Sequence, residues 1–348
     1  MDPLGHLIDT SRRELQGGAS DPRRLFASGA ISRLRRGFYV PTDLWVSLEV
    51  HDRFLLVLAA HAQANPDTVF CGETALFLHG IPTVKAPVAV EVATPTTSRL
   101  GVRPSTFEAR GDGCLAAKAR ELGGHPIRRH HHDDIEPVTV GEFATVPVAL
   151  ALVEVLAAGK FARGLTVADG VLRLQPDVPL LDRSDVVAAI SNLPHRSHRL
   201  RSELIASLAR SGAESPGESV GRALMHLFGF PEPKLQVAHY DALGFVGRTD
   251  YYWGQSEAEC AVHSRERLDP VGEFDGWGKY FRRTMTRGED PREIIRREKR
   301  RENRLLGLGH PVLRLDWLDL ERPAQFRAKL RAVGLRPTGS AAMADKRS

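Results

Sequence analysis

The stretch from Gly247 to Tyr280 constrains the fold of this chain more than any other part of the sequence. It starts with GRTDYYW, which alternates like a β-strand and carries Asp250, and it ends with PVGEFDGWGKY, which carries Glu273 and Asp275. Residues i and i+2 of a strand lie on one face, so Glu273 and Asp275 are expected on the same side, with Phe274 turned into the core. The stretch therefore predicts two strands that bring carboxylates together.

Three carboxylates and a lysine on two adjacent strands can hold a hard cation and position a water molecule. Mg²⁺ is usually held by one or two carboxylates, with water and phosphate in the remaining positions. We predict a site for Mg²⁺ (or Mn²⁺) at Asp250, Glu273 and Asp275, with Lys279 beside it, of the kind that hydrolyses phosphodiesters. The alternative is a polar strand end with an exposed Asp-Gly turn.

Positive charge is concentrated directly after this stretch. Residues 282–304 contain ten Lys or Arg and five Asp or Glu, a surplus equal to the net charge of +5 of the whole chain. A local basic field of this kind is compatible with nucleic acid as a partner. Part of it is also expected as a solvated helix face, because Glu293 and Arg297 are spaced i,i+4. The residues predicted to bind the DNA backbone are Arg296, Arg297, Arg300 and Arg304.

The remaining composition is that of a globular protein of two or three domains. The chain has 348 residues, of which 42% are hydrophobic and 26% charged, as is ordinary for globular proteins. Its three cysteines, Cys71, Cys114 and Cys260, are far apart and show no CxxC spacing, so we expect reduced, buried thiols. Because the sequence shows no signal-peptide pattern and no apolar run of about 18 residues, we predict a cytoplasmic protein without a membrane span.

Residues 1–45 are predicted to form a small winged-helix-like unit. Apolar residues between Leu4 and Leu15 have the spacing of one helical face, Asp21-Pro22 is typical of a helix start, and a basic hairpin follows. Arginines on such a hairpin would contact phosphates, giving affinity without sequence choice. These arginines are Arg33, Arg35 and Arg36. The alternative is a short hairpin with a solvated basic tip.

Two blocks of this half of the chain resemble the AbiEi-type antitoxin family of type IV toxin–antitoxin systems. The run SGAISRLRRGFYVP is similar to the N-terminal segment of that family, and VFCGETALFLHGIP is similar to its next block, a buried helix that ends in a His-Gly turn. The similarity extends over residues 20–175. The resemblance implies a winged helix that binds DNA, transcriptional autoregulation, and a cognate toxin as a protein partner.

The middle region, residues 46–200, is predicted to be an α/β domain that ends in a linker. Apolar helices are expected at 52–64 and 146–156, and a buried strand at 88–93. The cluster RRHHHDD at 128–134 could bind Zn²⁺, but adjacent strand residues point to opposite faces, and no distant Cys or His partner has ligand spacing. We therefore interpret this cluster as a polar strand end.

The last domain is predicted to span residues 201–338, after a basic linker at 195–201 and before a disordered tail at 339–348. Pro216 and Glu218 suit the start of a helix, and the pattern that follows predicts the order α-β-β-β-α-β, a mixed sheet with flanking helices. Glu218 has two interpretations, a structural residue of the helix start or a further carboxylate of the metal site. The whole chain is expected to be α/β, of the α+β type.

This last domain resembles the very-short-patch-repair-like endonucleases of the PD-(D/E)XK nuclease superfamily. The similar segments are ESPGESVGR, PKLQV, GFVGRTDYYW, VGEFDGWGKY and EKRRENRLLGLGHPVLRLDW, within residues 214–318. The resemblance implies a restriction-endonuclease-like sheet and metal-dependent cleavage of DNA. It assigns catalytic positions to Glu218, Gln236, Asp250 and Glu273.

Two further positions depart from the pattern of that family. Asp275 stands where the family often has a lysine, and Lys279 lies where the repair-type branch tends to have a histidine. With Asp250 and Glu273 as metal ligands, Lys279 would orient the nucleophile or stabilise charge on the phosphate. The alternative function is a non-catalytic antitoxin or transcriptional regulator that carries an inactive nuclease fold.

Overall fold

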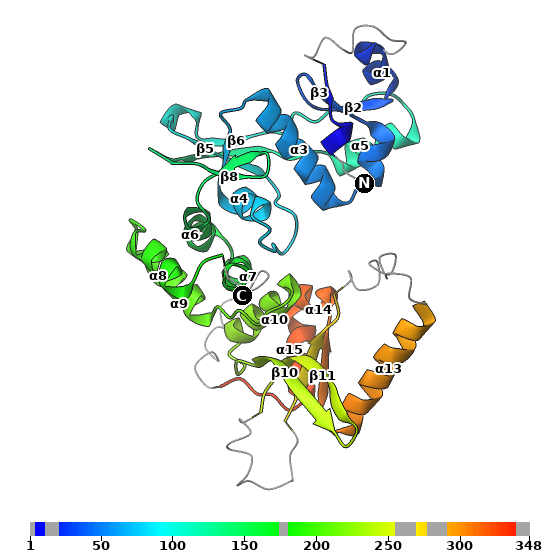
Figure 1. Cartoon of the computed structure of the whole chain (residues 1–348), viewed down its shortest axis with the longest axis vertical. Coiled ribbons are helices and arrows are strands. Elements are labelled where there is room, and N and C mark those ends of the chain that lie inside the picture. Colours follow the sequence, from blue (N-terminus) through cyan, green and yellow to red (C-terminus); the bar gives the residue numbers. More distant parts are fainter. Residues whose placement is uncertain (1–3, 11–20, 174–179, 255–268, 277–290, 339–348) are drawn as a thin grey trace. The chain divides into compact units, whose positions relative to one another are not determined.

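The computed structural model describes most of the chain, namely residues 4–10, 21–173, 180–254, 269–276 and 291–338. The chain forms two compact units: unit 1 comprises residues 1–158 and 188–194, and unit 2 comprises residues 159–187 and 195–348 (Figure 1). This division follows residue 158, whereas the boundaries expected from the sequence lie after residues 45 and 200. Among the described helices, none is long and apolar enough to cross a lipid bilayer.

Unit 1 begins with a small antiparallel sheet of strand order β1-β3-β2. Helix α1 (Pro22–Ser28) precedes the hairpin formed by β2 (Ile31–Arg35) and β3 (Phe38–Pro41). The Asp21 side chain caps α1 by accepting a backbone N–H at 3.0 Å. Gly29 ends the helix with a φ of 82°, a left-handed conformation that glycine adopts without steric cost. The helix and basic hairpin expected from the sequence are therefore present.

The helix expected from Leu4 to Leu15 is absent from its described part, residues 4–10. Leu4–His6 form a 3₁₀ turn (η1), and Ile8–Asp9 form strand β1, which pairs antiparallel with β3. The two leucines of this segment pack against the core of unit 1. The prediction is wrong here because tertiary packing and strand pairing satisfy the apolar residues without a helix.

A six-stranded mixed sheet forms the rest of unit 1, with the order β6-β7-β5-β4-β9-β8. Its strands are β4 (Val69–Phe70), β5 (Val90–Thr94), β6 (Gly101–Arg103), β7 (Ile127–His131), β8 (Val138–Val140) and β9 (Phe143–Thr145). The accompanying helices are α2 (Thr42–Ser47), α3 (Val50–Ala64), α4 (Gly72–Leu78), the 3₁₀ turn η3 (Thr97–Arg99), α5 (Cys114–Leu122) and α6 (Val148–Ala158). The expected helices correspond to α3 and α6, and the expected strand to β5.

One hydrophobic core joins the hairpin to the six-stranded sheet. Leu34, Phe38 and Val40 of the hairpin belong to the same buried cluster as Phe54 of α3 and Phe70 of β4. Burying a side chain of this size stabilises a fold by about 1.5–3 kcal/mol. The winged-helix-like residues and the α/β residues therefore share one body, which explains why the chain does not divide near residue 45.

Unit 2 is built around a four-stranded mixed sheet of order β10-β11-β12-β13. Strands β10 (Lys234–Asp241), β11 (Gly244–Tyr252) and β12 (Val271–Phe274) pair antiparallel, and β13 (Val312–Leu315) runs parallel to β12. The helices are α7 (Phe161–Leu172), α8 (Arg183–Ser191, partly assigned to unit 1), α9 (Arg196–Leu208), α10 (Pro216–Leu227), α13 (Pro291–Gly307), α14 (Trp317–Glu321) and α15 (Pro323–Ala332). The order α10-β10-β11-β12-α13-β13 confirms the predicted arrangement and the mixed α/β fold class.

Residues 195–201, interpreted from the sequence as a basic linker, instead form the N-cap and the first turns of helix α9 (Arg196–Leu208). Its next turn is buried, because Ser202 and Ile205 pack inside unit 2, and α9 lies against α7. The Arg201 guanidinium donates a hydrogen bond to the carbonyl of Gly159. The linker prediction is wrong because a charged outer helix face has the same composition as a linker, and only the buried face distinguishes the two.

A buried ion pair connects α7 to α10. Oδ2 of Asp169 lies 2.7 Å from Nη1 of Arg222, and the two side chains are only 1% and 2% exposed. Asp169 also accepts hydrogen bonds from Ser219 Oγ at 2.7 Å and from the backbone N–H of Arg210 at 2.8 Å. Burial raises the pKa of Asp169, and the positive charge of Arg222 opposes that change. If either charge lost its partner, the other would remain buried and unpaired, which would destabilise the fold.

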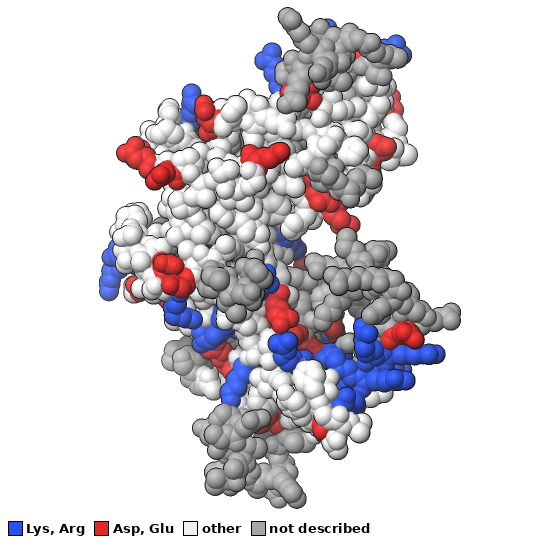
Figure 2. All heavy atoms as spheres, in the orientation of Figure 1, with Lys and Arg blue, Asp and Glu red and all other residues white. Residues whose placement is uncertain are grey.

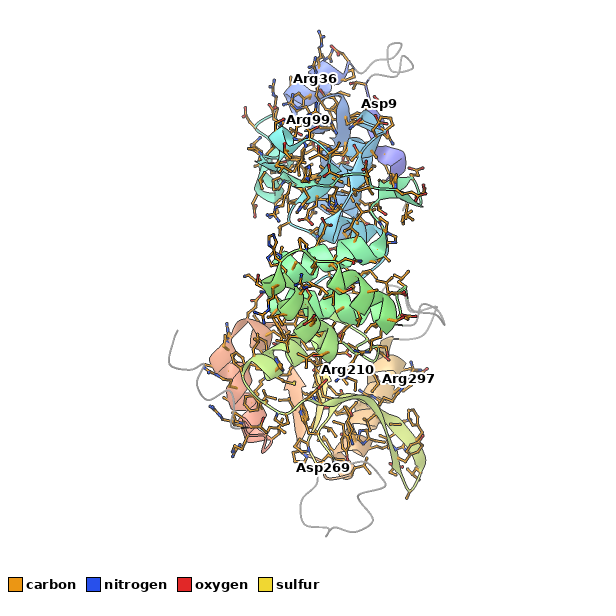
Figure 3. The ribbon with its side chains drawn as sticks, turned by 90° about the vertical axis from the view of Figure 1, so that its left-hand side faces the viewer. Asp9, Arg36, Arg99, Arg210, Asp269 and Arg297 are labelled. Carbon is orange, nitrogen blue, oxygen red and sulfur yellow. The ribbon has the colours of Figure 1, made fainter. Side chains whose placement is uncertain are left out.

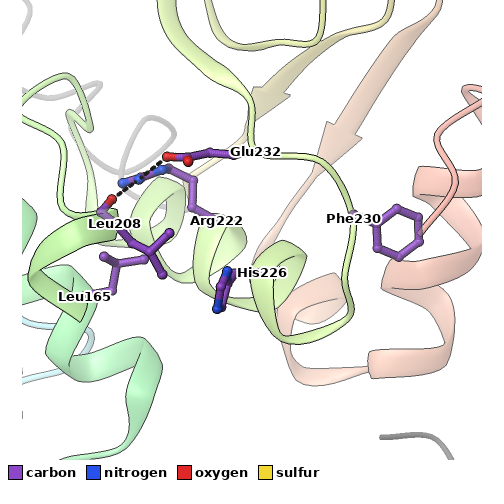
Figure 4. Close-up of a pocket in the computed structure, with 6 residues that line it drawn as sticks. All are labelled: Leu165, Leu208, Arg222, His226, Phe230 and Glu232. Atoms are coloured by element: carbon purple, nitrogen blue, oxygen red, sulfur yellow. Dashed lines mark hydrogen bonds and ion pairs between the residues drawn. The ribbon is translucent and has the colours of Figure 1, made fainter. Parts of the chain in front are cut away.

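Arg222 also lines a small pocket within unit 2 (Figure 4). The other lining residues are Leu165, Leu208, His226, Phe230 and Glu232. Nη2 of Arg222 donates to the backbone carbonyl of Leu208 and to Oε1 of Glu232, the latter at 3.2 Å. The guanidinium therefore holds together α7, the end of α9 and the segment that leads into β10.

We expect Arg222→Met to destabilise unit 2 by about 3–5 kcal/mol, because it leaves the Asp169 carboxylate buried without a cation. The double variant Arg222→Met/Asp169→Leu should recover much of this loss, since no unpaired charge remains. Urea denaturation of the full chain measures both effects. The matched control is Lys118→Gln, which breaks the exposed Lys118–Glu121 pair and should cost less than about 1 kcal/mol. If Arg222→Met and Lys118→Gln lowered the free energy of unfolding equally, the Arg222–Asp169 pair would not have this stabilising role.

Candidate active site on the four-stranded sheet

Four polar residues from four neighbouring strands form a row across the sheet of unit 2. Glu273 of β12 pairs with Arg314 of β13. The β11–β12 register continues to place Asp250 opposite Glu273, and the β10–β11 register places Gln236 beside Asp250. Side chains that are opposite each other in a sheet share a face. Gln236, Asp250, Glu273 and Arg314 are named the polar row below.

Hydrogen bonds connect the predicted catalytic residues of the row to one another and to α10. Nε2 of Gln236 donates to Oδ1 of Asp250 at 3.2 Å and to Oε2 of Glu218 at 3.4 Å. Oδ2 of Asp250 accepts the backbone N–H of Phe274 at 2.8 Å. The structure thus brings Glu218, Gln236 and Asp250 together next to Glu273, and their role as one catalytic site stays a prediction.

Gln236 reaches both acids from a strained backbone. Its φ is 53°, in the left-handed region, where a residue other than glycine costs on the order of 1–3 kcal/mol. It lies between Leu235 and Val237, which both keep regular pairing with β11. Strained backbone conformations of this kind are often found where a side chain is held in a particular position. Here the conformation places the Gln236 amide within hydrogen-bonding distance of Glu218 and Asp250.

Glu218 lies at the first turn of α10 and is 4% exposed. The hydroxyl of Ser215 caps the helix by accepting the Glu218 N–H at 3.3 Å and donates to Oε1 of Glu218 at 2.7 Å, while the Glu214 N–H reaches Oε2 at 2.9 Å. Burial, and then the negative charge of Asp250, raise the pKa of Glu218 to about 7. Glu218 therefore serves the helix start and also borders the polar row.

The first turn of α10 approaches β12 closely because residue 217 is a glycine. A Cβ atom on Gly217 would lie 1.9 Å from Cε1 of Phe274. Phe274 is 3% exposed and also packs edge-on against Trp317, with ring centroids 5.4 Å apart. The expected inward position of Phe274 is confirmed, and this contact fixes Glu218 relative to the strand that carries Glu273.

Two arginines that sequence reasoning missed compensate Glu273, which is 6% exposed. Nη2 of Arg301, on α13, lies 2.9 Å from Oε1 and donates to Oε2 at 3.1 Å; Nη2 of Arg314 lies 3.8 Å from Oε2. Burial raises the pKa of Glu273, and the two guanidinium groups oppose that change. Arg301 is one of many basic residues of its segment, so no signal in the sequence singles it out.

Asp275 lies near the same guanidinium group as Glu273. Its Oδ2 is 3.2 Å from Nη1 of Arg314, which fits the expectation that Asp275 and Glu273 share a side of the strand. Asp275 is more accessible, with 37% of its side chain exposed. Lys279 lies outside the described residues, so the structure gives no position for it.

Asp250 and Glu273 offer carboxylate oxygens, the donor type that a divalent cation such as Mg²⁺ prefers. Oε1 of Glu273 is buried and makes no hydrogen bond among the described residues, but it lies 2.9 Å from Nη2 of Arg301 in an ion pair. Each Asp250 oxygen accepts one hydrogen bond from the described residues. Among the described residues, no three of Glu218, Asp250, Glu273 and Asp275 have donor atoms within 4.8 Å of one another. Mg²⁺ is commonly held by only one or two carboxylates, which Asp250 and Glu273 would supply.

The hairpin arginines that were predicted to contact DNA have different surroundings. Arg33 forms an ion pair with Glu108, and Nη1 of Arg35 lies 2.8 Å from Nδ1 of His61, in an environment whose burial lowers the pKa of Arg35. Arg36 is exposed at the turn of the hairpin and is labelled in Figure 3. Of the three, Arg36 is the most exposed, whereas Arg33 and Arg35 are half-buried.

Helix α13 carries the other predicted DNA-binding residues. Arg296, Arg297 and Arg300 are exposed, and Figure 2 shows basic side chains gathered over this helix; Figure 3 labels Arg297. Arg304 is different, because its Nε and Nη2 donate to the Asp241 carboxylate at 2.8 and 2.6 Å. Arg304 therefore fastens α13 to the β10–β11 hairpin.

Comparison of the chain with protein-family models, with curated proteins and with solved structures identified no match in any of the three. The two family resemblances are therefore carried by the sequence segments quoted above, and the activities that they imply stay predictions. The geometry of the polar row and the exposed basic helix are the physical observations from which function is inferred.

We expect the raised pKa of Glu218 to make stability depend on pH. The native carboxyl keeps its proton up to about pH 7, whereas the unfolded carboxyl loses it near the usual glutamate pKa of 4.5. The native state therefore binds more protons in this window, so its free energy of unfolding falls as pH rises, by up to about 3 kcal/mol.

Urea denaturation of wild type and Glu218→Gln between pH 4.5 and 8 measures this effect. Because glutamine mimics the protonated carboxyl, the variant should gain stability relative to wild type as pH rises to about 7, with no further change above it. Glu203→Gln, on the exposed surface of α9, is the matched control and should show no such trend. A constant difference between Glu218→Gln and wild type would rule out the raised pKa.

Proposed function

We propose that unit 2 is a metal-dependent phosphodiester hydrolase that acts on DNA, with the polar row as its active centre. The observation that carries this proposal is the convergence of Glu218, Gln236, Asp250 and Glu273 from one helix and three strands. Burying carboxylates close together costs free energy. A bound divalent cation would offset this cost, because its positive charge neutralises the carboxylates, and it would also bind a phosphate group.

Asp250 and Glu273 are the residues that would hold Mg²⁺ (or Mn²⁺), since both are carboxylates on one face of adjacent strands. When bound, the metal would lower the pKa of a water molecule and neutralise charge on the scissile phosphate. Gln236 and the Phe274 N–H keep the Asp250 carboxylate in place. A ligand that is already positioned loses little entropy when the site is filled.

Glu218 is suited to exchange a proton near neutral pH. A carboxyl with a pKa of about 7 is present in both protonation states under these conditions, and a general acid or base works best when its pKa is near the working pH. Through Gln236, which donates to both carboxylates, Glu218 also helps to orient Asp250.

Arg301 would exchange its partner when DNA binds. Its side chain is 25% exposed, whereas that of Glu273 is 7% exposed, so the guanidinium can move outward more easily than the carboxylate can. Arginine often forms bidentate hydrogen bonds with phosphate oxygens. On release from Glu273, Arg301 would contact the DNA backbone next to the exposed basic residues of α13.

The second candidate function is a non-catalytic DNA-binding regulator, with a cognate toxin as an additional partner. The observation in its favour is that Arg301 already neutralises Glu273, with an ion-pair distance of 2.9 Å. Asp275 also stands where the resembled nucleases often carry a lysine. In this case Arg301 would be a permanent structural partner, and the polar row would be a remnant of a nuclease site.

We expect the full-length protein to nick supercoiled plasmid in the presence of Mg²⁺ or Mn²⁺, and Asp250→Asn and Glu273→Gln to reduce the rate by at least about a hundredfold. Both substitutions keep the shape of the side chain and remove a negative charge that would bind the metal. Nicking is followed on agarose gels, with chelation by EDTA as a further test.

Glu203→Gln is the matched control for the cleavage assay, because it removes an exposed acid of the same unit and should leave the rate unchanged. Absence of nicking by wild type with either metal, together with DNA binding that Asp250→Asn does not alter, would support the regulator instead. Cleavage that persists in both site variants would exclude the polar row as the active centre.

We expect the double variant Arg296→Gln/Arg300→Gln to weaken DNA binding at every sequence tested. The two residues are exposed and lie one helical turn apart on α13, so they would reach neighbouring phosphates. Removing two phosphate contacts should reduce the slope of log K against log salt by about 2. Fluorescence anisotropy with labelled duplexes at several salt concentrations measures this slope.

The control double variant is Arg196→Gln/Arg331→Gln, which removes two exposed charges from α9 and α15 of the same unit. It lowers the net charge equally and should leave the slope within about half a unit of wild type. If both double variants reduced the slope equally, the change would reflect the net charge of the protein. This result would contradict the proposal that α13 is the DNA-binding element.

A further inference from the structure

Unit 1 contains a second cluster of chemically reactive side chains, far apart in the sequence. Cys71 lies between β4 and α4, His132 directly follows β7, and Glu154 lies on α6. The Cys71 sulfur, an imidazole nitrogen of His132 and a carboxylate oxygen of Glu154 all lie within 4.8 Å of one another. Sequence reasoning found no distant ligand for the histidines of residues 128–134; the structure corrects this, because the fold supplies a cysteine and a glutamate.

Backbone hydrogen bonds to β5 hold two of the three residues. The N–H of Cys71 donates to the Glu91 carbonyl at 3.1 Å, and the N–H of His132 donates to the Thr94 carbonyl at 3.1 Å. β5 lies between β4 and β7 in the sheet, so Cys71 and His132 approach from its two sides. α6 packs against α4 and brings Glu154 over the same point.

The side chains are arranged as donors that face a common point. Nε2 of His132 is buried and has no hydrogen-bond partner among the described residues, although Oε1 of Glu154 lies only 2.6 Å away. Oε2 of Glu154 accepts the Gly72 N–H at 2.9 Å, which fixes the carboxylate, and Oε1 lies beside the histidine.

The cluster is enclosed but not sealed from solvent. Cys71 is fully buried, whereas the side chains of His132 and Glu154 are 10% and 17% exposed. A second imidazole–carboxylate pair lies beside it, with Nε2 of His130 at 3.3 Å from Oε1 of Glu91. Two glutamates next to a buried thiol make the surroundings negative, which favours a cation.

We propose that Cys71, His132 and Glu154 form a binding site for a transition-metal dication of the zinc type. Sulfur and imidazole nitrogen favour Zn²⁺ over Mg²⁺. In a tetrahedral zinc site the donors are about 3.3–3.6 Å apart, so shifts of roughly an ångström would complete this geometry. Binding forms a metal–sulfur bond and releases the thiol proton to solvent. Three protein ligands leave a fourth position for water or an added ligand.

The competing explanation is that His132 and Glu154 form a plain ion pair at the start of α4 and that Cys71 is an inert core thiol. The two explanations differ in whether the sulfur binds a metal. Co²⁺ is the probe that separates them, because it takes the place of Zn²⁺ in tetrahedral sites and its bond to a cysteine sulfur gives a charge-transfer absorption in the near ultraviolet.

The experiment is a titration of the chelator-treated full-length protein with Co²⁺, followed by displacement with Zn²⁺. We expect one equivalent of Co²⁺ to produce the sulfur charge-transfer band and Zn²⁺ to remove it. Cys71→Ser should abolish the band, and Glu154→Gln, which can still accept the Gly72 N–H, should weaken Co²⁺ binding by at least about tenfold. Cys114→Ser and Cys260→Ser are the matched controls and should keep the band.

Two outcomes would overturn the proposal. One is wild-type protein that gives no charge-transfer band, and the other is a band that survives in Cys71→Ser. If Cys71→Ser does not fold, as judged by circular dichroism, the titration of Glu154→Gln decides, because unchanged Co²⁺ affinity in that variant excludes Glu154 as a ligand. The site lies in unit 1, so none of these outcomes depends on the activity proposed for unit 2.

Discussion

The register of the four-stranded sheet is the constraint on which unit 2 depends. β12 pairs antiparallel with β11 and parallel with β13, and this pairing alone places Asp250, Glu273 and Arg314 side by side. The intervening residues Tyr251 and Phe274 turn to the other face and are buried. A slip of one residue would exchange the two faces. The same register therefore packs Tyr251 and Phe274 toward α10 on one face and places the polar row on the other, and Gln236 links the row to Glu218 at the start of α10.

Buried acids in unit 2 are compensated in two different ways. Asp169 is paired with Arg222, which is 2% exposed and is held by further contacts to Leu208 and Glu232. Glu273 is paired with Arg301, which is 25% exposed and comes from the rim of a basic helix. The first arrangement is permanent, because moving either group would leave a charge in the interior. In the second, the guanidinium is more exposed than the carboxylate with which it pairs.

In unit 1, strand pairing around β5 likewise brings polar side chains together. The pairing of β5 with β4 on one side and β7 on the other brings Cys71 and His132 to one point, and α6 adds Glu154. In both units, polar side chains from elements on either side of a central strand lie close together at the edge of the hydrophobic core. Such positions combine a rigid scaffold with access to solvent, which is what ligand binding needs.

Local signals in the sequence determined the secondary structure and part of the site. The helix start at Pro216 and Glu218 and the alternation around Asp250 each act over a few residues, so they could be recognised without the fold. Together with the resemblance to nucleases, they led to Glu218, Gln236, Asp250 and Glu273, which the structure brings together. The helix expected from Leu4 lacked such caps, and tertiary packing overrode it.

Only the tertiary structure decided which charged residue meets which partner. Arg301 and Arg304 are one turn apart on the same basic helix, yet Arg301 reaches Glu273 and Arg304 reaches Asp241. Arg33 and Arg35 have structural partners, whereas Arg36 stays at the surface. Cys71 and Glu154 became neighbours of His132 through three separate elements. The physical reason is that local sequence sets the conformation of each element, while the partner of a side chain is set by long-range packing of one element against another.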